Sequence, residues 1–374
     1  MNYTYHHYQT ALAFLHGVGP RRARALMAHL PSLEILFTAS SKDLAQLTGL
    51  SPGFFGKMQR TQALEKVDRI LAFHNKHNIH SLFYKDAEYS RRLNQCADAP
   101  TQLFMKGNVD LNQSRFVAIV GTRSATDYGQ RLCRELIASF QGRNIVVVSG
   151  LAHGIDGHVH RYCLEYDVPT IGVLGHGLDR IYPAIHRSLA SQMTRAGALL
   201  TEFVPGTDPD RENFPKRNRI VAGMCDATVV VESKSSGGSL ITAHIANSYN
   251  RDVFAFPGMV YQETSQGCNN LIASSKAHLL ETPEAFLTFM QWNETINSTE
   301  KTQFLCFPEI SKVQQEIVRE IQAHPKIQLD VLSAQLAIPI STLQVELLQL
   351  RLSGIVEELP GKQLQLLHHG HHVT

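Results

Sequence analysis

Six short apolar runs in the middle of the chain constrain its fold more than any other feature of the sequence. They are rich in Val and Ile, and they lack the polar alternation of strands that face water on one side. The runs are FVAIVG (116–121), NIVVVSG (144–150), PTIGVLG (169–175), ALLTE (198–202), ATVVVE (227–232) and DVFAFPG (252–258). Segments with helical periodicity, such as YGQRLCRELIASF, lie between most of them. The alternation predicts an α/β fold over residues 78–290, with a Rossmann-like, doubly wound and mostly parallel sheet.

Two different modules are predicted on either side of this sheet. Residues 1–77 have helical periodicity, and LHGVGPRRARALMAHL with its looser echo LTGLSPGFFGKM resembles a pair of helix-hairpin-helix units. Arg21, Arg22 and Arg24 would suit a phosphate there, but a small packing module would need the same glycines for its turns. Residues 291–307 lose all pattern and predict a linker. Residues 308–374 have the outline of a winged helix.

The overall charge predicts no particular partner. The 374 residues include 35 Lys and Arg against 33 Asp and Glu, so an anion would need a local cluster of cations. No run of eighteen apolar residues suggests a membrane span, and the N-terminus lacks the features of a signal peptide. The six cysteines are scattered without a CxxC pair and are expected to be reduced thiols. We therefore expect a cytoplasmic protein.

The loops that follow the predicted strands share small residues, mostly with Ser or Thr, close to a helix start. Ligands of doubly wound sheets bind beyond the carboxyl ends of the strands, where helix N-termini offer free N–H groups and a positive dipole end. Six cations are expected on the same edge of the sheet: Arg123, Arg180, Lys216, Arg217, Arg219 and Lys234. The pattern predicts a row of sites for a phosphate chain. Taken singly, a glycine could serve only to turn the chain, and Arg123 could form a structural ion pair.

The densest cationic stretch is FPKRNRIVAG (214–223). Pro215 is predicted at the first position of a helix, which puts Lys216, Arg217 and Arg219 in its first turn. Cations there oppose the helix dipole unless a phosphate is bound, so the stretch favours an anion site. One of the arginines could brace the sheet instead. Asn218 could bond backbone or a base edge.

No catalytic, metal or cofactor site is predicted. His153, Asp156, His158 and His160 in HGIDGHVH are spaced too closely to share a helix face, and Asp156 is expected to cap the next helix. The sequence has no GxSxG elbow and no P-loop, and GTRSATDYG is not a GxGxxG fingerprint. A dinucleotide is therefore not expected despite the fold.

Taken together, the motifs resemble one family, DNA-processing protein A, also called DprA or Smf. They are GTRSATDYG, SGLAHGID, VLGHGLDRIYP, FPKRNRIVAG, SGGSLITA with NRDVFAFPG, and GCNNLI, in family order over residues 80–280. The resemblance implies a sterile-alpha-motif-like helical domain before the sheet and a winged helix after it. It also implies sequence-independent binding of single-stranded DNA, protection of incoming DNA in natural transformation, and loading of the RecA recombinase. The resemblance further implies single-strand binding protein as a partner and a homodimer through the C-terminal part of the Rossmann-like domain. It implies no catalysis.

Carried over by motif, or placed on the same edge by the loops, the strand-binding candidates number ten. They are Arg123, Gly150, Arg180, Lys216, Arg217, Asn218, Arg219, Lys234, Ser239 and Thr242. Phe214 and Tyr182 are expected to stack on bases. The chain departs from the family at Ala184 and His186, where a cation is usual, so His186 or Arg187 would have to substitute. It also has Lys276 where the family has glycine, which puts a turn near the expected dimer contact in question.

Two other classes of function stay open on the sequence. A nucleotide phosphoribohydrolase of the lysine-decarboxylase-like type shares a Rossmann core, but SGGSLIT at 236–242 lacks the second glycine and the Glu of its PGGxGTxxE motif. A protein-interaction adaptor fits the C-terminal module better, because STLQVELLQLRL is mostly apolar where a DNA-reading helix is basic. We therefore predict a protein partner or self-contact for that helix.

Overall fold

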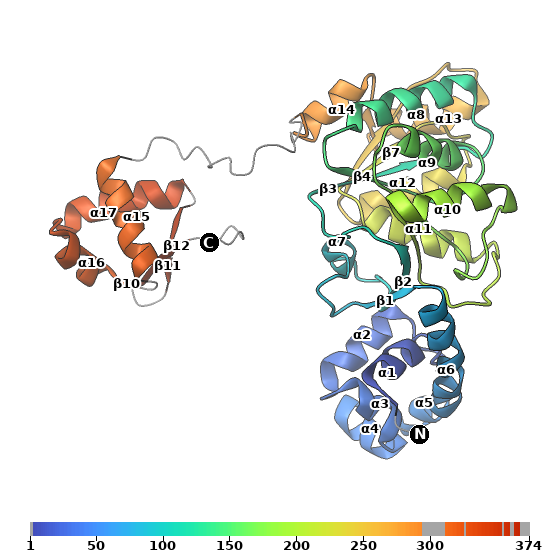
Figure 1. Cartoon of the computed structure of the whole chain (residues 1–374), viewed down its shortest axis with the longest axis horizontal. Coiled ribbons are helices and arrows are strands. Elements are labelled where there is room, and N and C mark those ends of the chain that lie inside the picture. The colour runs from blue at the N-terminus through green and yellow to red at the C-terminus, as the bar shows by residue number, and fades with distance from the viewer. Residues whose placement is uncertain (1–2, 294–310, 325–326, 354, 360–362, 367–374) are drawn as a thin grey trace. The chain divides into compact units, whose positions relative to one another are not determined.

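The structure of the chain is a computed structural model that describes residues 3–293, 311–324, 327–353, 355–359 and 363–366 (Figure 1). It divides into two compact units, Met1–Asn297 and Ser298–Thr374. The predicted linker at 291–307 lies mostly outside the described residues. Its first part belongs to the first unit, because Trp292 is buried and its ring packs on Phe286 at 5.6 Å.

The first unit contains a nine-stranded sheet in the order β1-β2-β6-β5-β4-β3-β7-β8-β9. The strands from β6 to β9 run parallel, and β2 joins β6 and β1 in antiparallel fashion. The strands are β1 (His80–Phe83), β2 (Gln102–Gly107), β3 (Arg115–Val120), β4 (Ile145–Ser149), β5 (Thr170–Val173), β6 (Ala198–Thr201), β7 (Ala227–Val230), β8 (Asp252–Ala255) and β9 (His278–Leu279). All six predicted strands are confirmed. The sequence prediction missed the two edge strands, β1 and β9, and also β2, which lies next to β1.

Helices cover both faces of the sheet, as its apolar strands require (Figure 1). Along β3, Phe116, Ala118 and Val120 enter one core, while Val117 and Ile119 enter the other. The first face is covered by α11 (Asn213–Gly223), α12 (Gly238–Ser248), α13 (Glu263–Ala273) and the short α7 (Arg91–Asn94). The second face is covered by α8 (Asp127–Phe140), α9 (Ile155–Glu165), α14 (Pro283–Phe289) and, beside the turn η1 (Ala184–His186), α10 (Arg187–Ala196). The doubly wound fold is therefore confirmed.

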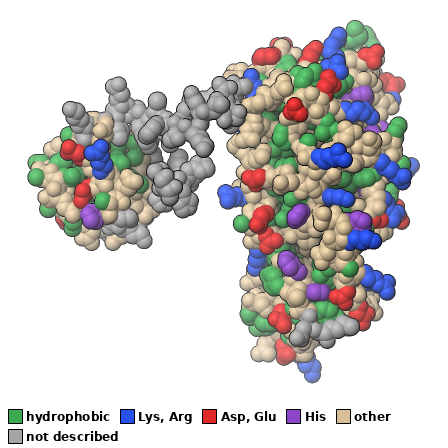
Figure 2. Space-filling view, viewed as in Figure 1, with side chains coloured by type: hydrophobic (Ala, Val, Ile, Leu, Met, Phe, Trp, Pro, Cys, Tyr) green, Lys and Arg blue, Asp and Glu red, His purple; other side chains and the backbone are tan. Residues whose placement is uncertain are grey.

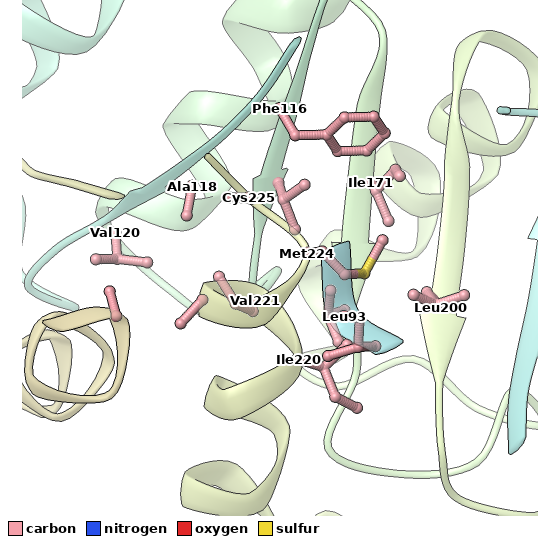
Figure 3. Close-up of a cluster of buried hydrophobic side chains, with 14 of the residues drawn as sticks. Leu93, Phe116, Ala118, Val120, Ile171, Leu200, Ile220, Val221, Met224 and Cys225 are labelled. Carbon is pink, nitrogen blue, oxygen red and sulfur yellow. The ribbon is translucent and has the colours of Figure 1, made fainter. Parts of the chain in front are cut away.

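The apolar half of FPKRNRIVAG anchors α11 in the first of these cores. Ile220 and Val221 pack with Phe116, Ile171 and other side chains of β3, β5 and β6 (Figure 3). The cationic half of the stretch is thereby held at the carboxyl end of the sheet, because α11 leads back to the start of β7. The helix itself is thus fixed by packing, whatever its charges bind.

Six helices precede the sheet and form a core of their own. They are α1 (Tyr5–Leu12), α2 (Pro20–His29), α3 (Leu33–Thr38), α4 (Ser41–Thr48), α5 (Pro52–Gly56) and α6 (Arg60–Lys76). This core includes Phe83 of β1. Arg22 donates to the Gly17 carbonyl oxygen at 2.8 Å, and Arg24 donates to Asn94 Oδ1 at 2.8 Å. Two of the three arginines suited to a phosphate are therefore engaged within the protein.

The second unit has the element order helix, strand, two helices and two strands. Its elements are α15 (Lys312–Ala323), β10 (Ile327–Gln328), α16 (Leu329–Leu336), α17 (Ile340–Leu352), β11 (Val356–Leu359) and β12 (Gln363–Leu366), with the sheet order β10-β12-β11. Val345 and Leu348 of α17 are about half exposed, at 56% and 55%. Within the described residues no single helix is long and apolar enough to cross a membrane, although the bent pair Leu329–Leu336 and Ile340–Arg351 passes on length and composition alone.

Candidate nucleic-acid interface

The carboxyl ends of β3, β4 and β5 border a small pocket, which we call the β4/β5 pocket. Its lining includes Arg123, Gly150, His153, Gly175, Tyr182 and Phe214. The rings of Tyr182 and Phe214 lie 6.3 Å apart, and the guanidinium of Arg123 lies 5.5 Å from the centre of the Phe214 ring. A Cβ on Gly175 would sit 3.2 Å from the Phe214 ring, so a larger residue there would push the ring outward. The pocket joins a cation to two aromatic rings at the edge where ligands of such sheets bind.

Arg217 lies beside two residues of this pocket, Gly150 and Phe214. The residue is 5% exposed, and its Nη1 donates to the carbonyl oxygens of Gly150 and Val173, at the ends of β4 and β5. Gly150 has no room for a side chain, because a Cβ there would collide with the guanidinium. Burial raises the pKa of the neighbouring Asp156, and the charge of Arg217 opposes that rise. Arg217 therefore braces two strand ends, as the sequence allowed for one of the arginines.

The start of α11 corrects the sequence prediction. The helix begins at Asn213 rather than Pro215, because the Asn213 N–H bonds the Asp210 carbonyl oxygen at 3.0 Å and the preceding turn runs directly into the helix. Pro215 is the third helical residue, where an N–H still has no partner within the helix. Arg217 and Arg219 consequently lie in the second turn, and the expected conflict with the helix dipole is weaker than predicted.

Arg219 is also committed inside the protein. Its guanidinium forms an ion pair with Glu202 and donates to the Asp98 carbonyl oxygen. The side chains of Arg219 and Glu202 are only 13% and 14% exposed. Burial raises the pKa of Glu202, and the charge of Arg219 opposes the rise. This pair ties α11 to the end of β6.

The remaining cations are exposed, but they differ in their partners. Arg123 and Lys216 make no ion pair within the described residues, and Lys216 Nζ lies 3.4 Å from Asn213 Oδ1. Arg180 pairs with Asp179 and Asp208. Lys234 pairs with Glu263 at 2.6 Å. A phosphate would therefore meet a cation without an ion-pair partner in the described structure at Arg123 and Lys216, and partly neutralised charge at Arg180 and Lys234.

The other candidates provide shape more than exposed donors. Asn218 accepts from Arg217 Nε at 3.1 Å, and Ser239 donates to Ser233 Oγ at 2.9 Å. Ser239 and Thr242 are 7% and 2% exposed. The β4/β5 pocket thus brings together Arg123, Gly150 and Phe214 of α11. At the start of α12, Gly238 is exposed while Ser239 is buried.

Within the histidine-rich stretch after β4, Asp156 and His160 are buried and support the fold. Asp156 accepts the N–H of Ala152 at 3.3 Å, so it fixes the loop before α9 rather than the helix end that was predicted. His160 is buried against the hydroxyl group of Thr170, and burial lowers its pKa to about 3. The described residues include no group of three His, Cys, Asp or Glu side chains that could hold a metal ion.

The two departures from the family motif have local explanations. His186 is 3% exposed, faces the Leu151 carbonyl oxygen at 3.0 Å and has its pKa lowered by burial. It is therefore not the substitute cation that the sequence suggested, whereas Arg187 is exposed. The turn at Lys276 forms normally, because Ser275 takes the left-handed conformation with φ of 54° and the Lys276 N–H bonds the Leu271 carbonyl oxygen at 2.8 Å.

Two positions on this edge of the sheet were missed by sequence reasoning. His176 bonds the Gly177 carbonyl oxygen through Nδ1 at 2.8 Å and accepts the Tyr182 N–H at 3.3 Å, which orients the aromatic wall of the β4/β5 pocket. Glu232 is buried at the end of β7 and accepts hydrogen bonds from Thr126. Its only signal in the sequence was an acidic residue closing the apolar run ATVVVE.

Comparison with known proteins agrees with this architecture. Residues 80–291 match the family model of DNA recombination-mediator protein A. Protein Smf of Synechocystis sp. is 32% identical over 96% of this chain and 98% of its own length. DNA processing protein DprA of Bacillus subtilis is 37% identical over 58% of this chain and 73% of its own length.

Solved structures give the same result. The structure of DNA processing protein A from Streptococcus pneumoniae matches with a TM-score of 0.64 and 32% identity, over 77% of this chain and 98% of that one. The structure of DNA processing protein A from Helicobacter pylori, described for its single-stranded DNA binding mode, shares the fold at a TM-score of 0.52 and 24% identity. It covers 57% of this chain and 95% of that one. These matches do not favour the phosphoribohydrolase alternative. The match over most of the Rossmann-like domain and the full-length similarity to Protein Smf show that this chain belongs to the DprA/Smf family of DNA recombination-mediator proteins.

Proposed function

We propose that the chain binds single-stranded DNA, independently of its sequence, at the β4/β5 pocket. The observation that carries this proposal is exposed Arg123, which makes no ion pair within the described residues and lies against the Phe214 ring beside Tyr182. Exposed Lys216, two residues after Phe214 on α11, adds a second cation. Cations with aromatic rings form the usual platform for a single strand, where phosphates give affinity and bases stack. Phosphate contacts carry no sequence information, which explains the expected tolerance.

The same geometry favours a single strand over a duplex. The two rings border a small pocket, and a base can reach them only if it is free of its partner strand. The charge is local, because Figure 2 shows cationic and anionic side chains interspersed over the visible face of the first unit. A rigid duplex would find no broad cationic face in that view, whereas a flexible strand can bend into a local site.

The wider role that we propose follows the family. The bound strand is protected during natural transformation and passed to the RecA recombinase in the cytoplasm, with single-strand binding protein as a further partner. This role needs no catalysis. We also propose a homodimer through the edge at β9, where Leu279 and Phe289 are 46% and 49% exposed. Sedimentation of Leu279→Asp against the unchanged chain tests the dimer.

Fluorescence anisotropy of a labelled single strand and an equally long duplex, each over a salt series, tests the binding proposal. We expect tighter binding of the single strand, with a slope of log affinity against log salt of about 0.7 per phosphate contacted. Equal affinity for both DNAs would contradict the proposal. Release of the base from AMP, measured on the same samples, would instead support the phosphoribohydrolase.

A further inference from the structure

The crevice between β3 and β7 is the place where the strand order of the sheet reverses. We call it the β3/β7 crevice and define it by Thr126, Glu232 and Thr264. In sheets of this topology such a crevice is the common ligand site, and the helix that starts there takes a phosphate on its free N–H groups. In this chain the carboxylate of Glu232 lies at that place.

Glu232 makes the contacts that a phosphate would otherwise make. Its Oε2 accepts the Thr126 N–H at 3.0 Å, and its Oε1 accepts the Thr126 hydroxyl at 2.6 Å. The hydroxyl of Thr264 lies 3.4 Å from Oε1. Thr126 is the N-cap of α8, and its oxygen accepts the Gly129 N–H at 3.3 Å. The carboxylate, the cap and the first turn of α8 therefore form one hydrogen-bonded chain.

This carboxylate has no ion-pair partner within the described residues, although it is 1% exposed. A buried ionised group is tolerated only where hydrogen bonds and local dipoles replace water. The two Thr126 donors and the positive end of α8 supply that replacement. The first turn of α8 also approaches closely, because a Cβ on Gly129 would collide with the Glu232 carboxylate. The residues around the crevice therefore accommodate the carboxylate of Glu232.

We infer that Glu232 is a specificity-determining residue, an internal anion that keeps the phosphates of nucleotides and of DNA out of the β3/β7 crevice. An external anion is then attracted on this edge at the β4/β5 pocket, beside which the cation Arg217 lies. The inference goes beyond the proposed function, since exclusion of nucleotides from the crevice does not require that the chain bind DNA.

Glu232→Ala in the full chain tests this inference, with inorganic phosphate and AMP as probes. We expect the variant to melt at a lower temperature than the unchanged chain. Added phosphate should restore part of that loss at constant ionic strength, because it takes over the hydrogen bonds of the carboxylate. Chloride should not. Glu135→Ala, which removes an exposed carboxylate of α8 that makes no ion pair within the described residues, is the control and should show no recovery by phosphate.

Direct binding, measured by phosphorus NMR, gives the second readout. We expect phosphate to bind Glu232→Ala at least about tenfold more tightly than the unchanged chain. A folded Glu232→Ala that gains neither phosphate binding nor recovery would overturn the inference. AMP that binds the unchanged chain and perturbs Thr126 would overturn it as well, even if the variant failed to fold. Single-strand anisotropy on the same samples keeps this result separate from the proposed function.

Discussion

The β3/β7 crevice and the β4/β5 pocket lie on the same edge of one sheet and are both formed by glycine-containing loops next to helix starts. They differ in the sign of the charge buried within them. Glu232 fills the crevice with a carboxylate, whereas Arg217 lies behind the pocket with a guanidinium. Exposed Arg123 adds a further positive charge to the lining of the pocket. The comparison teaches that the sheet topology creates several potential anion sites at this edge. The charge of one buried side chain then decides which of them can bind an anion.

Removing the buried cation should give the largest effect. Arg217→Ala leaves the carbonyl oxygens of Gly150 and Val173 without their donor and Asp156 without a nearby opposite charge. We expect a loss of about 3–5 kcal/mol in the free energy of unfolding. Urea unfolding followed through Trp292, the single tryptophan and buried in this domain, measures it.

Lys216→Ala, one residue away and exposed, is the control for that experiment and should change stability by less than about 0.5 kcal/mol. Equal losses in the two variants would mean that Arg217 is not a brace. The distinction between a buried cation that stabilises the fold and an exposed cation that does not would then be contradicted.

A second, smaller effect concerns the pH dependence of folding stability, through the buried side chain of His160. Burial, together with the charges of His186, Arg217 and Arg161, lowers the pKa of His160 to about 3. The unfolded chain takes up a proton near pH 6.5 while the folded chain does not, so the stability from this group is present above pH 6.5 and is lost as pH falls. We expect the loss between pH 7 and pH 5 to be about 2 kcal/mol for this residue.

Urea unfolding at the two pH values, compared with His160→Asn, isolates this contribution. The variant should lose less stability on acidification than the unchanged chain. If both lost the same amount, the other buried histidines, such as His74 with its pKa lowered to about 4, would account for the acid sensitivity.

Replacing the exposed cations Arg123 and Lys216 should weaken DNA binding without lowering folding stability. Arg123→Ala and Lys216→Ala are each expected to weaken single-strand binding about tenfold and to reduce the salt slope by somewhat less than one. Unfolding free energies should stay within about 0.5 kcal/mol of the unchanged chain. A loss of affinity with an unchanged salt slope would show that these side chains do not contact phosphates.

The smallest effect is expected from the cations that already have acidic partners. Arg180 pairs with Asp179 and Asp208, and Lys234 pairs with Glu263. Exposed pairs of this kind contribute little, so Arg180→Ala and Lys234→Ala should each weaken single-strand binding less than about threefold. Effects as large as those at Arg123 would place the strand along the whole edge rather than at the pocket.

The sequence predicted the central strands because each is apolar on both faces, and it predicted the anion edge because ligand loops follow such strands. It missed the edge strands β1 and β9, since HSLF and HL are short and partly exposed, and it also missed β2 beside β1. It identified the cations of FPKRNR but could not say which were buried. That distinction depends on Gly150, Val173 and Glu202, which are distant in sequence and meet α11 only in the folded sheet.

Photo-crosslinking of an iodouracil-substituted single strand, with the modified residues mapped by mass spectrometry, tests the central claim most directly. If the β4/β5 pocket binds the strand, crosslinks should form at Tyr182 and Phe214. The double variant Arg123→Ala/Lys216→Ala should abolish these crosslinks. Crosslinks confined to residues 1–77 or to the second unit would contradict the account. Crosslinks at Thr126 or Thr264 would contradict it too, because the strand would then enter the crevice that Glu232 is inferred to close.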